Sequence, residues 1–180
     1  MRVIAGQYGG RSLVAPRGRA VRPTSDRVRE ALFSILGPLD GEHALDLFAG
    51  SGALGIEALS RGASQATFVD AAASAITAVR RNLDALGIEA EVHRVPALRF
   101  LEGARAAAAQ YDLVFLDPPY RQADALGGEL GPALAAVLAP SARVVAESDR
   151  RAPLELEPLT LRTERRYGDT LIRVYREPSR

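Results

Sequence analysis

The spacing of apolar positions changes along the chain, and each change predicts a different kind of element. Near the N-terminus, two short apolar-rich runs flank a glycine-rich segment, which predicts a β-hairpin formed by residues 2–5 and 11–15. Thr24-Ser25-Asp26 then supplies helix N-cap chemistry. The apolar residues after it recur at helical spacing and predict a helix with one buried face: Val28, Ala31, Leu32, Ile35 and Leu36.

From residue 43 onward, strands and helices are expected to alternate. Apolar runs predict strands at 44–48, 66–69, 90–95, 112–116 and 143–146, and amphipathic segments predict helices at 54–60, 72–86, 98–109 and 130–138. Two extended runs, 160–165 and 170–175, are joined by Tyr167-Gly168-Asp169 and predict a closing hairpin. The pattern is typical of an α/β fold whose mostly parallel sheet has helices on both faces, with one antiparallel strand from the hairpin.

Composition narrows the class of protein. The chain has 180 residues and no cysteine, which excludes disulfides, thiolate metal sites and a cysteine nucleophile. With only His43 and His93, we also expect no metal. The N-terminus lacks the long apolar run of a signal peptide, and no stretch has the roughly 20 apolar residues of a membrane span. We therefore expect a cytoplasmic protein without membrane contact, and a monomer, because no heptad pattern is present.

Charge is balanced overall, at +1, but its distribution is uneven. Every basic residue is arginine, which codon bias would explain, although arginine also suits phosphate recognition. Residues 1–30 hold seven arginines against two acids, Asp26 and Glu30, and so predict a polyanion contact. Residues 1–23 would form this basic hairpin extension, and 24–180 a catalytic domain. The candidate phosphate contacts, which solvated surface arginines would equally explain, are Arg11, Arg17, Arg19 and Arg22.

A glycine-rich turn follows the first of the alternating strands. In the run from Asp46 to Gly55, the glycines fit G-x-G-x-x-G between a predicted strand and a predicted helix, a turn that lets a nucleotide approach the backbone. Asp70 ends the next strand, where a carboxylate suits ribose hydroxyls. Asp46 would repel a dinucleotide pyrophosphate, whereas it suits the cationic amino-acid tail of S-adenosylmethionine. A solvated or capping aspartate is the structural alternative.

A second motif, Asp117-Pro118-Pro119-Tyr120, follows the strongly apolar run 113–116. It therefore lies at the carboxyl end of a strand, where open α/β sheets bind ligands. The prolines remove two N–H donors, so that Asp117 and carbonyl oxygens can accept from an –NH₂ group, while Tyr120 offers a stacking face. A simple proline turn with Asp117 as a helix cap is the alternative.

Together these motifs resemble the S-adenosylmethionine-dependent methyltransferases that act on exocyclic amines. The segment Arg22-Pro23-Thr24-Ser25-Asp26-Arg27 and the closing Arg166-Tyr167-Gly168-Asp169-Thr170 narrow the resemblance to the bacterial 16S rRNA guanine-N2 methyltransferase family of the RsmD type. The likeness covers essentially the whole chain. It implies a Rossmann-like class I methyltransferase with a seven-stranded sheet, with S-adenosylmethionine as cofactor and 16S rRNA or the small ribosomal subunit as partner.

The resemblance also assigns roles to residues. Asp117, Pro118 and Tyr120 would be catalytic, Asp46 would hold the methionine amino group and Asp70 the ribose. The remaining expected cofactor contacts are Ala49, Gly50, Ser51, Gly52, Ala97, Thr24 and Arg27. Pro96-Ala97 departs from the acidic or amide residue usual beside adenine, which leaves the Ala97 N–H for that role.

Other functions fit parts of the sequence. The nearest is a DNA adenine-N6 or cytosine-N4 methyltransferase, which shares the second motif, although about 40 residues outside the catalytic sheet are few for a sequence-reading domain. A protein-glutamine methyltransferase usually has asparagine before the two prolines. A nicotinamide-dependent oxidoreductase conflicts with Asp46, and a non-catalytic RNA-binding assembly factor conflicts with the intact second motif.

Overall fold

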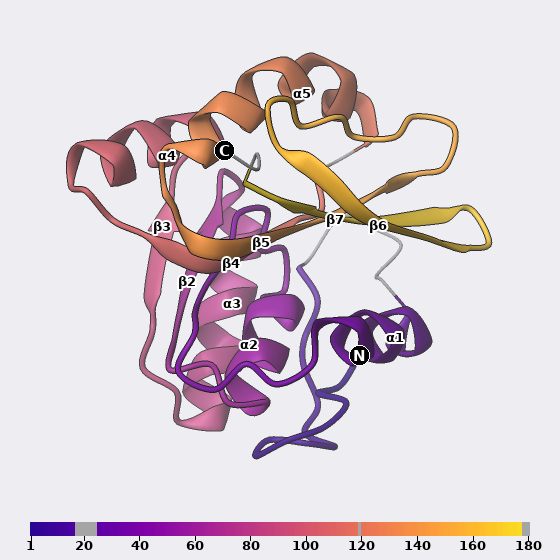
Figure 1. The fold of residues 1–180 in the computed structure, drawn as a ribbon. Coiled ribbons are helices and arrows are strands. Elements are labelled where there is room, and N and C mark those ends of the chain that lie inside the picture. Colours follow the sequence, from indigo (N-terminus) through magenta and orange to yellow (C-terminus); the bar gives the residue numbers. More distant parts are fainter. Residues whose placement is uncertain (17–24, 119, 178–180) are drawn as a thin grey trace. The chain divides into compact units, whose positions relative to one another are not determined.

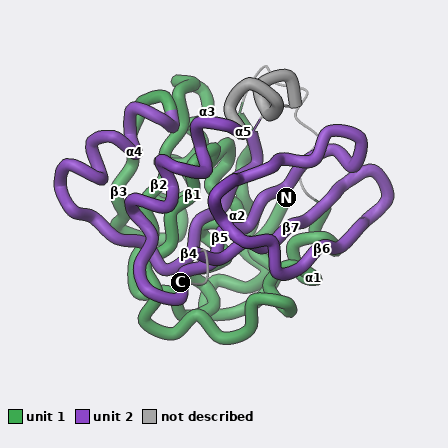
Figure 2. The backbone as a smooth tube through the Cα atoms, turned by 45° about the horizontal axis from the view of Figure 1, so that its top comes forward, with its two compact units in different colours: residues 1–96 green, residues 97–180 purple. Residues whose placement is uncertain are grey.

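The structure, a computed structural model, describes residues 1–16, 25–118 and 120–177, without the side chains of residues 120–127. The chain forms two compact units, Met1–Pro96 and Ala97–Arg180, drawn in green and purple in Figure 2. The N-terminal hairpin belongs to the first unit. The predicted boundary between residues 23 and 24 lies outside the described residues and remains a prediction.

The first unit contains three parallel strands in the order β3-β2-β1. Their carboxyl ends are in register, because Asp46 pairs with Phe68 and Asp70 pairs with Arg94. This places two carboxylates at the same edge of the strands. The strands are β1 (His43–Asp46), β2 (Gln65–Asp70) and β3 (Glu91–Arg94).

Three helices accompany these strands, and α2 and α3 pack against them (Figure 1). The first begins as predicted, because the Ser25 hydroxyl caps it by accepting a hydrogen bond from the Val28 N–H. The second starts directly after the glycine-rich turn, which places its N-terminus at the carboxyl edge of β1. The helices are α1 (Asp26–Leu36), α2 (Ala53–Ser60) and α3 (Ala73–Leu86).

The predicted N-terminal hairpin is confirmed, although its pairing is short. Arg2 and Ser12 form an antiparallel bridge, the Val3 N–H donates to the Arg11 carbonyl at 2.9 Å, and the Leu13 N–H donates to the Met1 carbonyl at 2.9 Å. Buried contacts fix this hairpin on α2: both carboxylate oxygens of Glu57 accept backbone N–H groups, from Ile4 and Ala5. The hairpin, residues 1–14, is thus an integral part of the first unit.

The second unit contains four strands in the order β4-β5-β7-β6. β4 and β5 are parallel, whereas β7 runs antiparallel to both β5 and β6, as expected for a closing hairpin. The strands are β4 (Tyr111–Leu116), β5 (Leu138–Asp149), β6 (Thr160–Tyr167) and β7 (Thr170–Arg176), and the helices are α4 (Ala97–Ala106) and α5 (Tyr120–Ala135).

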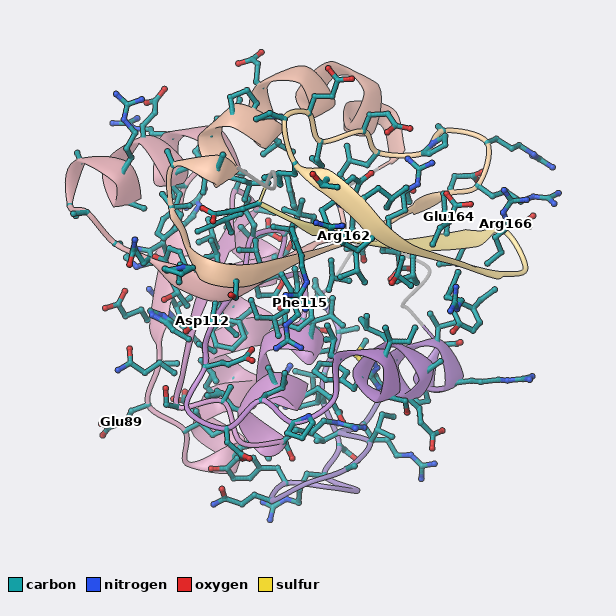
Figure 3. All side chains as sticks on the ribbon, viewed as in Figure 1. Glu89, Asp112, Phe115, Arg162, Glu164 and Arg166 are labelled. Carbon is teal, nitrogen blue, oxygen red and sulfur yellow. The ribbon has the colours of Figure 1, made fainter. Side chains whose placement is uncertain are left out.

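Glu164 on β6 forms one ion pair within its own strand and one with β7, and the second pair joins the two strands of the closing hairpin. Glu164 and Arg166 lie close together on β6 (Figure 3), with 3.2 Å between Arg166 Nη2 and Glu164 Oε1. The other Glu164 oxygen accepts from Arg173 Nε on β7 at 2.9 Å. Both hydrogen bonds lower the pKa of the Glu164 carboxyl, and the bond from Arg173 has the larger effect. At the turn, Asp169 pairs with Arg150 at 3.2 Å, which gives the terminal Tyr-Gly-Asp segment a structural role.

Some boundaries differ from those predicted. α5 begins at Tyr120, ten residues before the predicted helix, although it contains several glycines and a proline. Close packing explains why residue 131 is glycine, because a Cβ there would lie 1.9 Å from the Glu157 carbonyl oxygen. The predicted helix 98–109 ends at Ala106, and the predicted strands 44–48 and 143–146 are 43–46 and 138–149. In the described part of the chain, no helix has the length and apolar character to cross a bilayer.

Candidate functional site

Asp46 lies at the carboxyl end of β1, directly before the glycine-rich turn. Its side chain is only 3% exposed, and its Oδ2 accepts the Gly55 N–H at 3.0 Å. Gly55 belongs to the first turn of α2, where backbone N–H groups have no partner within the helix. The carboxylate of Asp46 therefore ties the end of β1 to the start of α2.

Asp70 occupies the equivalent position at the end of β2. Its Oδ2 accepts the Gly50 N–H at 3.0 Å and its Oδ1 accepts the Ala72 N–H at 2.8 Å. The two carboxylates thus hold both sides of the turn formed by residues 49–52. Each carboxylate oxygen has two lone pairs, so these bonds leave acceptor capacity for ribose hydroxyls.

Burial governs the charge of Asp46. Loss of solvent raises the pKa of its carboxyl from 3.8 to about 7, the hydrogen bond from Gly55 opposes this rise, and the nearby Asp70 charge adds to it. Among the described residues, no basic side chain forms an ion pair with Asp46. A cation bound at this position would therefore gain a favourable interaction with the ionised carboxylate.

The three glycines of the turn have different roles. Gly50 and Gly52 adopt φ of +55° and +79°, conformations that other residues rarely adopt. Gly55 has ordinary helical geometry, but a Cβ there would lie 2.4 Å from Cε1 of Phe68 on β2. Gly55 thus allows α2 to pack closely on the strands, whereas Gly50 and Gly52 shape the turn itself.

Ala49 and Ser51, two further predicted cofactor contacts, are buried in the turn. The Ala49 N–H donates to the Val69 carbonyl at 3.0 Å. Ser51 Oγ contacts Met1 Sδ at 3.3 Å, and the Ser51 carbonyl accepts a hydrogen bond from Asn82 on α3 at 2.8 Å. Asn82 was not predicted from the sequence, although a lone amide among the apolar positions of this helix is a signal that could have identified it.

The α1 candidates differ in how far the structure describes them. Thr24 lies outside the described residues. Arg27 is an exposed residue near the start of α1. By contrast, Arg29 is 1% exposed and donates to the Arg2 carbonyl at 2.6 Å and to Asp26 Oδ1 at 2.7 Å. Sequence reasoning missed Arg29, which fastens the N-terminal hairpin to α1.

The second motif belongs to the second unit. Asp117, which is partly exposed, and Pro118, which is buried, directly follow β4. Tyr120 is the first residue of α5, and its side chain lies outside the description. Ala97 is the first residue of α4 and is buried. The carboxylate thus follows a strand whose last four residues are almost fully buried: Leu113, Val114, Phe115 and Leu116.

Of the predicted phosphate contacts, the structure describes one. Arg11 lies in the N-terminal hairpin, has an exposed side chain and donates from Nη2 to the Ala85 carbonyl at 3.3 Å. The other three lie outside the described residues: Arg17, Arg19 and Arg22.

Comparison with known proteins identifies the family. The family model described as Conserved hypothetical protein 95 matches residues 1–176. Ribosomal RNA small subunit methyltransferase D of Haemophilus influenzae is 37% identical over 97% of this chain and 93% of its own length. The protein of that name from Escherichia coli is 42% identical over 68% of this chain and 61% of its own length. The chain belongs to the RsmD-type methyltransferase family. This membership confirms the resemblance found in the sequence and the predicted enzyme class, a ribosomal RNA methyltransferase.

Solved structures agree with this assignment. The Escherichia coli protein yhhF superposes with a TM-score of 0.83 at 37% identity, over 99% of both chains. The Thermus thermophilus 16S rRNA N2 G1207 methyltransferase, solved with AdoMet and guanosine, gives a TM-score of 0.71 at 22% identity, over 90% of this chain and 44% of its own, and shows a shared fold. The predicted Rossmann-like class I methyltransferase fold is confirmed.

Proposed function

We propose that this RsmD-type enzyme transfers a methyl group from S-adenosylmethionine to the exocyclic N2 amine of a guanine in 16S rRNA. The observation that carries the proposal is Asp117-Pro118 at the carboxyl end of the buried strand β4, in a member of a ribosomal RNA methyltransferase family. A carboxylate and a carbonyl at that position can accept both hydrogens of an amine.

The glycine-rich turn fits the cofactor. S-Adenosylmethionine carries an ammonium group, and Asp46 is a carboxylate whose burial raises its pKa to about 7. In the proposal, Asp46 binds that ammonium, Asp70 binds the ribose hydroxyls and the Gly50–Gly52 turn lets the cofactor approach the backbone. Ala49 and Ser51, which belong to the turn, are further proposed cofactor contacts. The Ala97 N–H would donate to the adenine, and Thr24 and Arg27 would bind the carboxylate of the cofactor.

The chemistry requires little more than orientation and charge stabilisation. When bound, the cofactor supplies a methyl group activated by the sulfonium. The guanine amine is a weak nucleophile because its lone pair is delocalised into the ring. In the proposal, Asp117 and the Pro118 carbonyl hold the amine hydrogens, direct the lone pair toward the methyl carbon and stabilise the positive charge that develops on nitrogen. The new C–N bond replaces the C–S bond, and nitrogen then loses one proton to solvent.

The target base must leave its stack to reach such acceptors, and Tyr120 is the proposed platform for the extruded guanine. The basic N-terminal segment would hold the neighbouring phosphates through Arg11, Arg17, Arg19 and Arg22. In the proposal, the target guanine is therefore locally single-stranded or easily unstacked in the RNA.

The experiment uses purified enzyme, isotopically labelled S-adenosylmethionine, and small-subunit RNA and particles from cells that lack this gene. Nucleosides released by digestion are identified by mass spectrometry, and N2-methylguanosine is the expected product. A labelled N6-methyladenosine, or methyl transfer to DNA but not RNA, would overturn the proposal in favour of the nucleic-acid amine alternatives.

Asp117→Ala tests the role of the acceptor. Loss of one preorganised acceptor should lower kcat by roughly 10²–10³. Asp117→Asn keeps one oxygen acceptor and should retain more activity than the alanine variant. Both variants should bind S-adenosylhomocysteine within about tenfold of the wild-type Kd, since Asp46 and Asp70 are intact. Undiminished turnover in Asp117→Ala would remove this residue from the chemistry.

A further inference from the structure

Asn82 is a buried amide on α3 that makes three hydrogen bonds to the backbone of two other segments. It is 2% exposed. Its Oδ1 accepts the Val14 N–H at 2.8 Å, and its Nδ2 donates to the Val14 carbonyl at 3.0 Å. Nδ2 also donates to the Ser51 carbonyl at 2.8 Å. One side chain thus joins the end of the N-terminal hairpin to the glycine-rich turn.

The bond to Ser51 fixes a particular peptide group. On one side of the Ser51-Gly52 peptide, the Ser51 carbonyl accepts from Asn82. On the other side, the Gly52 N–H donates to the Ala49 carbonyl at 2.6 Å. A peptide plane bonded at both ends cannot rotate without breaking a buried hydrogen bond. Asn82 therefore restrains the orientation of the turn at the residue where φ is +79°.

Met1 Sδ of the hairpin also contacts Ser51 Oγ at 3.3 Å, but among the described residues no other side-chain amide joins the hairpin to the turn. Ser60 on α2 holds the hairpin in a comparable way, because its Oγ accepts the Tyr8 N–H at 2.9 Å and donates to the Ala5 carbonyl. Ser60 is 4% exposed, so it matches Asn82 in burial and in the segment it binds. Because its hydroxyl bonds involve only the hairpin, Ser60 separates the effect of holding the hairpin from that of holding the turn.

We propose that Asn82 is a positioning residue for cofactor binding, acting through the Ser51-Gly52 peptide. The inference rests on the proposed function, in which the Gly50–Gly52 turn binds S-adenosylmethionine. Without the Nδ2 donor, the Ser51 carbonyl loses a buried partner and the peptide gains alternative orientations. The cofactor must then select one of them, which weakens its binding but leaves the acceptors of the amine unchanged.

The test compares Asn82→Ala and the near-isosteric Asn82→Asp, which loses the donor, with Ser60→Ala as the matched control. Binding of S-adenosylhomocysteine is measured by calorimetry, and KM and kcat are measured with RNA. For both Asn82 variants, the Kd of S-adenosylhomocysteine and the KM of S-adenosylmethionine should rise about tenfold or more, as expected from one lost buried hydrogen bond. At saturating cofactor, kcat should stay within about twofold of wild type, and Ser60→Ala should leave both cofactor constants within about twofold.

Thermal melting of all three variants identifies effects that come from stability alone. Equal weakening of cofactor binding in Ser60→Ala and in the Asn82 variants would overturn the proposal, and so would unchanged cofactor constants in Asn82→Asp. If Asn82→Ala does not fold, the cofactor constants of Asn82→Asp alone test the proposal. Failure of wild-type enzyme to bind S-adenosylhomocysteine, or to methylate RNA, would instead count against the proposed function, which makes the two failures distinguishable.

Discussion

The Gly55 N–H donates to Asp46 across 3.0 Å, and this bond joins the last residue of β1 to the first turn of α2. It partly compensates for the burial of the carboxylate, but not fully, because the pKa of Asp46 remains raised to about 7. The same residue is proposed to bind the cofactor ammonium. Burial disfavours the ionised form of Asp46 in the free protein, and a cation bound beside it would favour that ionised form again.

The first prediction concerns stability. The pKa of Asp46 is about 7 in the folded protein against 3.8 for the unperturbed group, so between these values the folded state binds more protons than the unfolded state. The free energy of unfolding should therefore fall as pH rises from about 4 to about 7, and level off above that. Asp46→Asn does not titrate. Relative to wild type it should gain stability between pH 5 and pH 8.5, by about 3 kcal/mol, because about two pH units of the shifted titration lie within this interval.

Urea unfolding of both proteins at pH 5 and pH 8.5 measures this difference. An asparagine oxygen can still accept the Gly55 N–H, so the variant is expected to keep the turn. If the two proteins show the same change in unfolding free energy between these pH values, Asp46 is ionised throughout and the prediction is wrong.

A second prediction concerns protons released on cofactor binding. The ammonium of S-adenosylhomocysteine should favour ionised Asp46 and lower its pKa, so binding near pH 7 should release part of one proton. Calorimetric titrations in buffers of different ionisation enthalpy give the number of protons directly. Release should disappear at pH 8.5, where Asp46 is already ionised, and in Asp46→Asn at either pH. Binding that releases no protons from wild type at pH 7 would place the ammonium elsewhere.

Much of the fold could be predicted from the sequence, because the elements depend on local periodicity. The amphipathic pattern of α3 and the apolar runs of β2 and β4 gave boundaries within one residue. The start of α5 could not be predicted, since the glycines and Pro132 in that segment favour a loop. Gly131 is compatible with the helix because of a contact with Glu157, 26 residues later, that no local pattern indicates.

The candidate site, like the fold, could be predicted only in part from the sequence. The spacing of Asp46, Gly50 and Asp70 identified the turn, but not that both carboxylates already accept backbone N–H groups. Those bonds depend on the register of β1 and β2, which sequence alone does not show. Asn82 and Arg29 were missed because each binds a backbone carbonyl far away in the chain, at Ser51 and Arg2.

A third prediction concerns Gly55 and its contact with Phe68. In Gly55→Ala, the added Cβ would lie 2.4 Å from Phe68 Cε1, so helix or ring must shift, at a cost of about 1–3 kcal/mol in unfolding free energy. Phe68→Leu removes the ring, and the alanine substitution should cost less in that background. Gly103→Ala in α4 is the control, because a Cβ there meets nothing within 4 Å. It should stabilise by about 0.5–1 kcal/mol. Urea unfolding of the double-mutant cycle would contradict the prediction if the two substitutions were additive.

A fourth prediction concerns the N-terminal hairpin as an RNA contact. If Arg11 binds a phosphate, Arg11→Ala should weaken RNA binding and reduce the slope of log K against log salt by about one, because one fewer counterion is released. Filter binding across a series of KCl concentrations measures that slope. Arg105→Ala, an exposed arginine at the end of α4, is the control and should leave the slope unchanged. Equal slopes for Arg11→Ala and wild type would show that this arginine is an ordinary solvated side chain, and would move the RNA contact away from the hairpin.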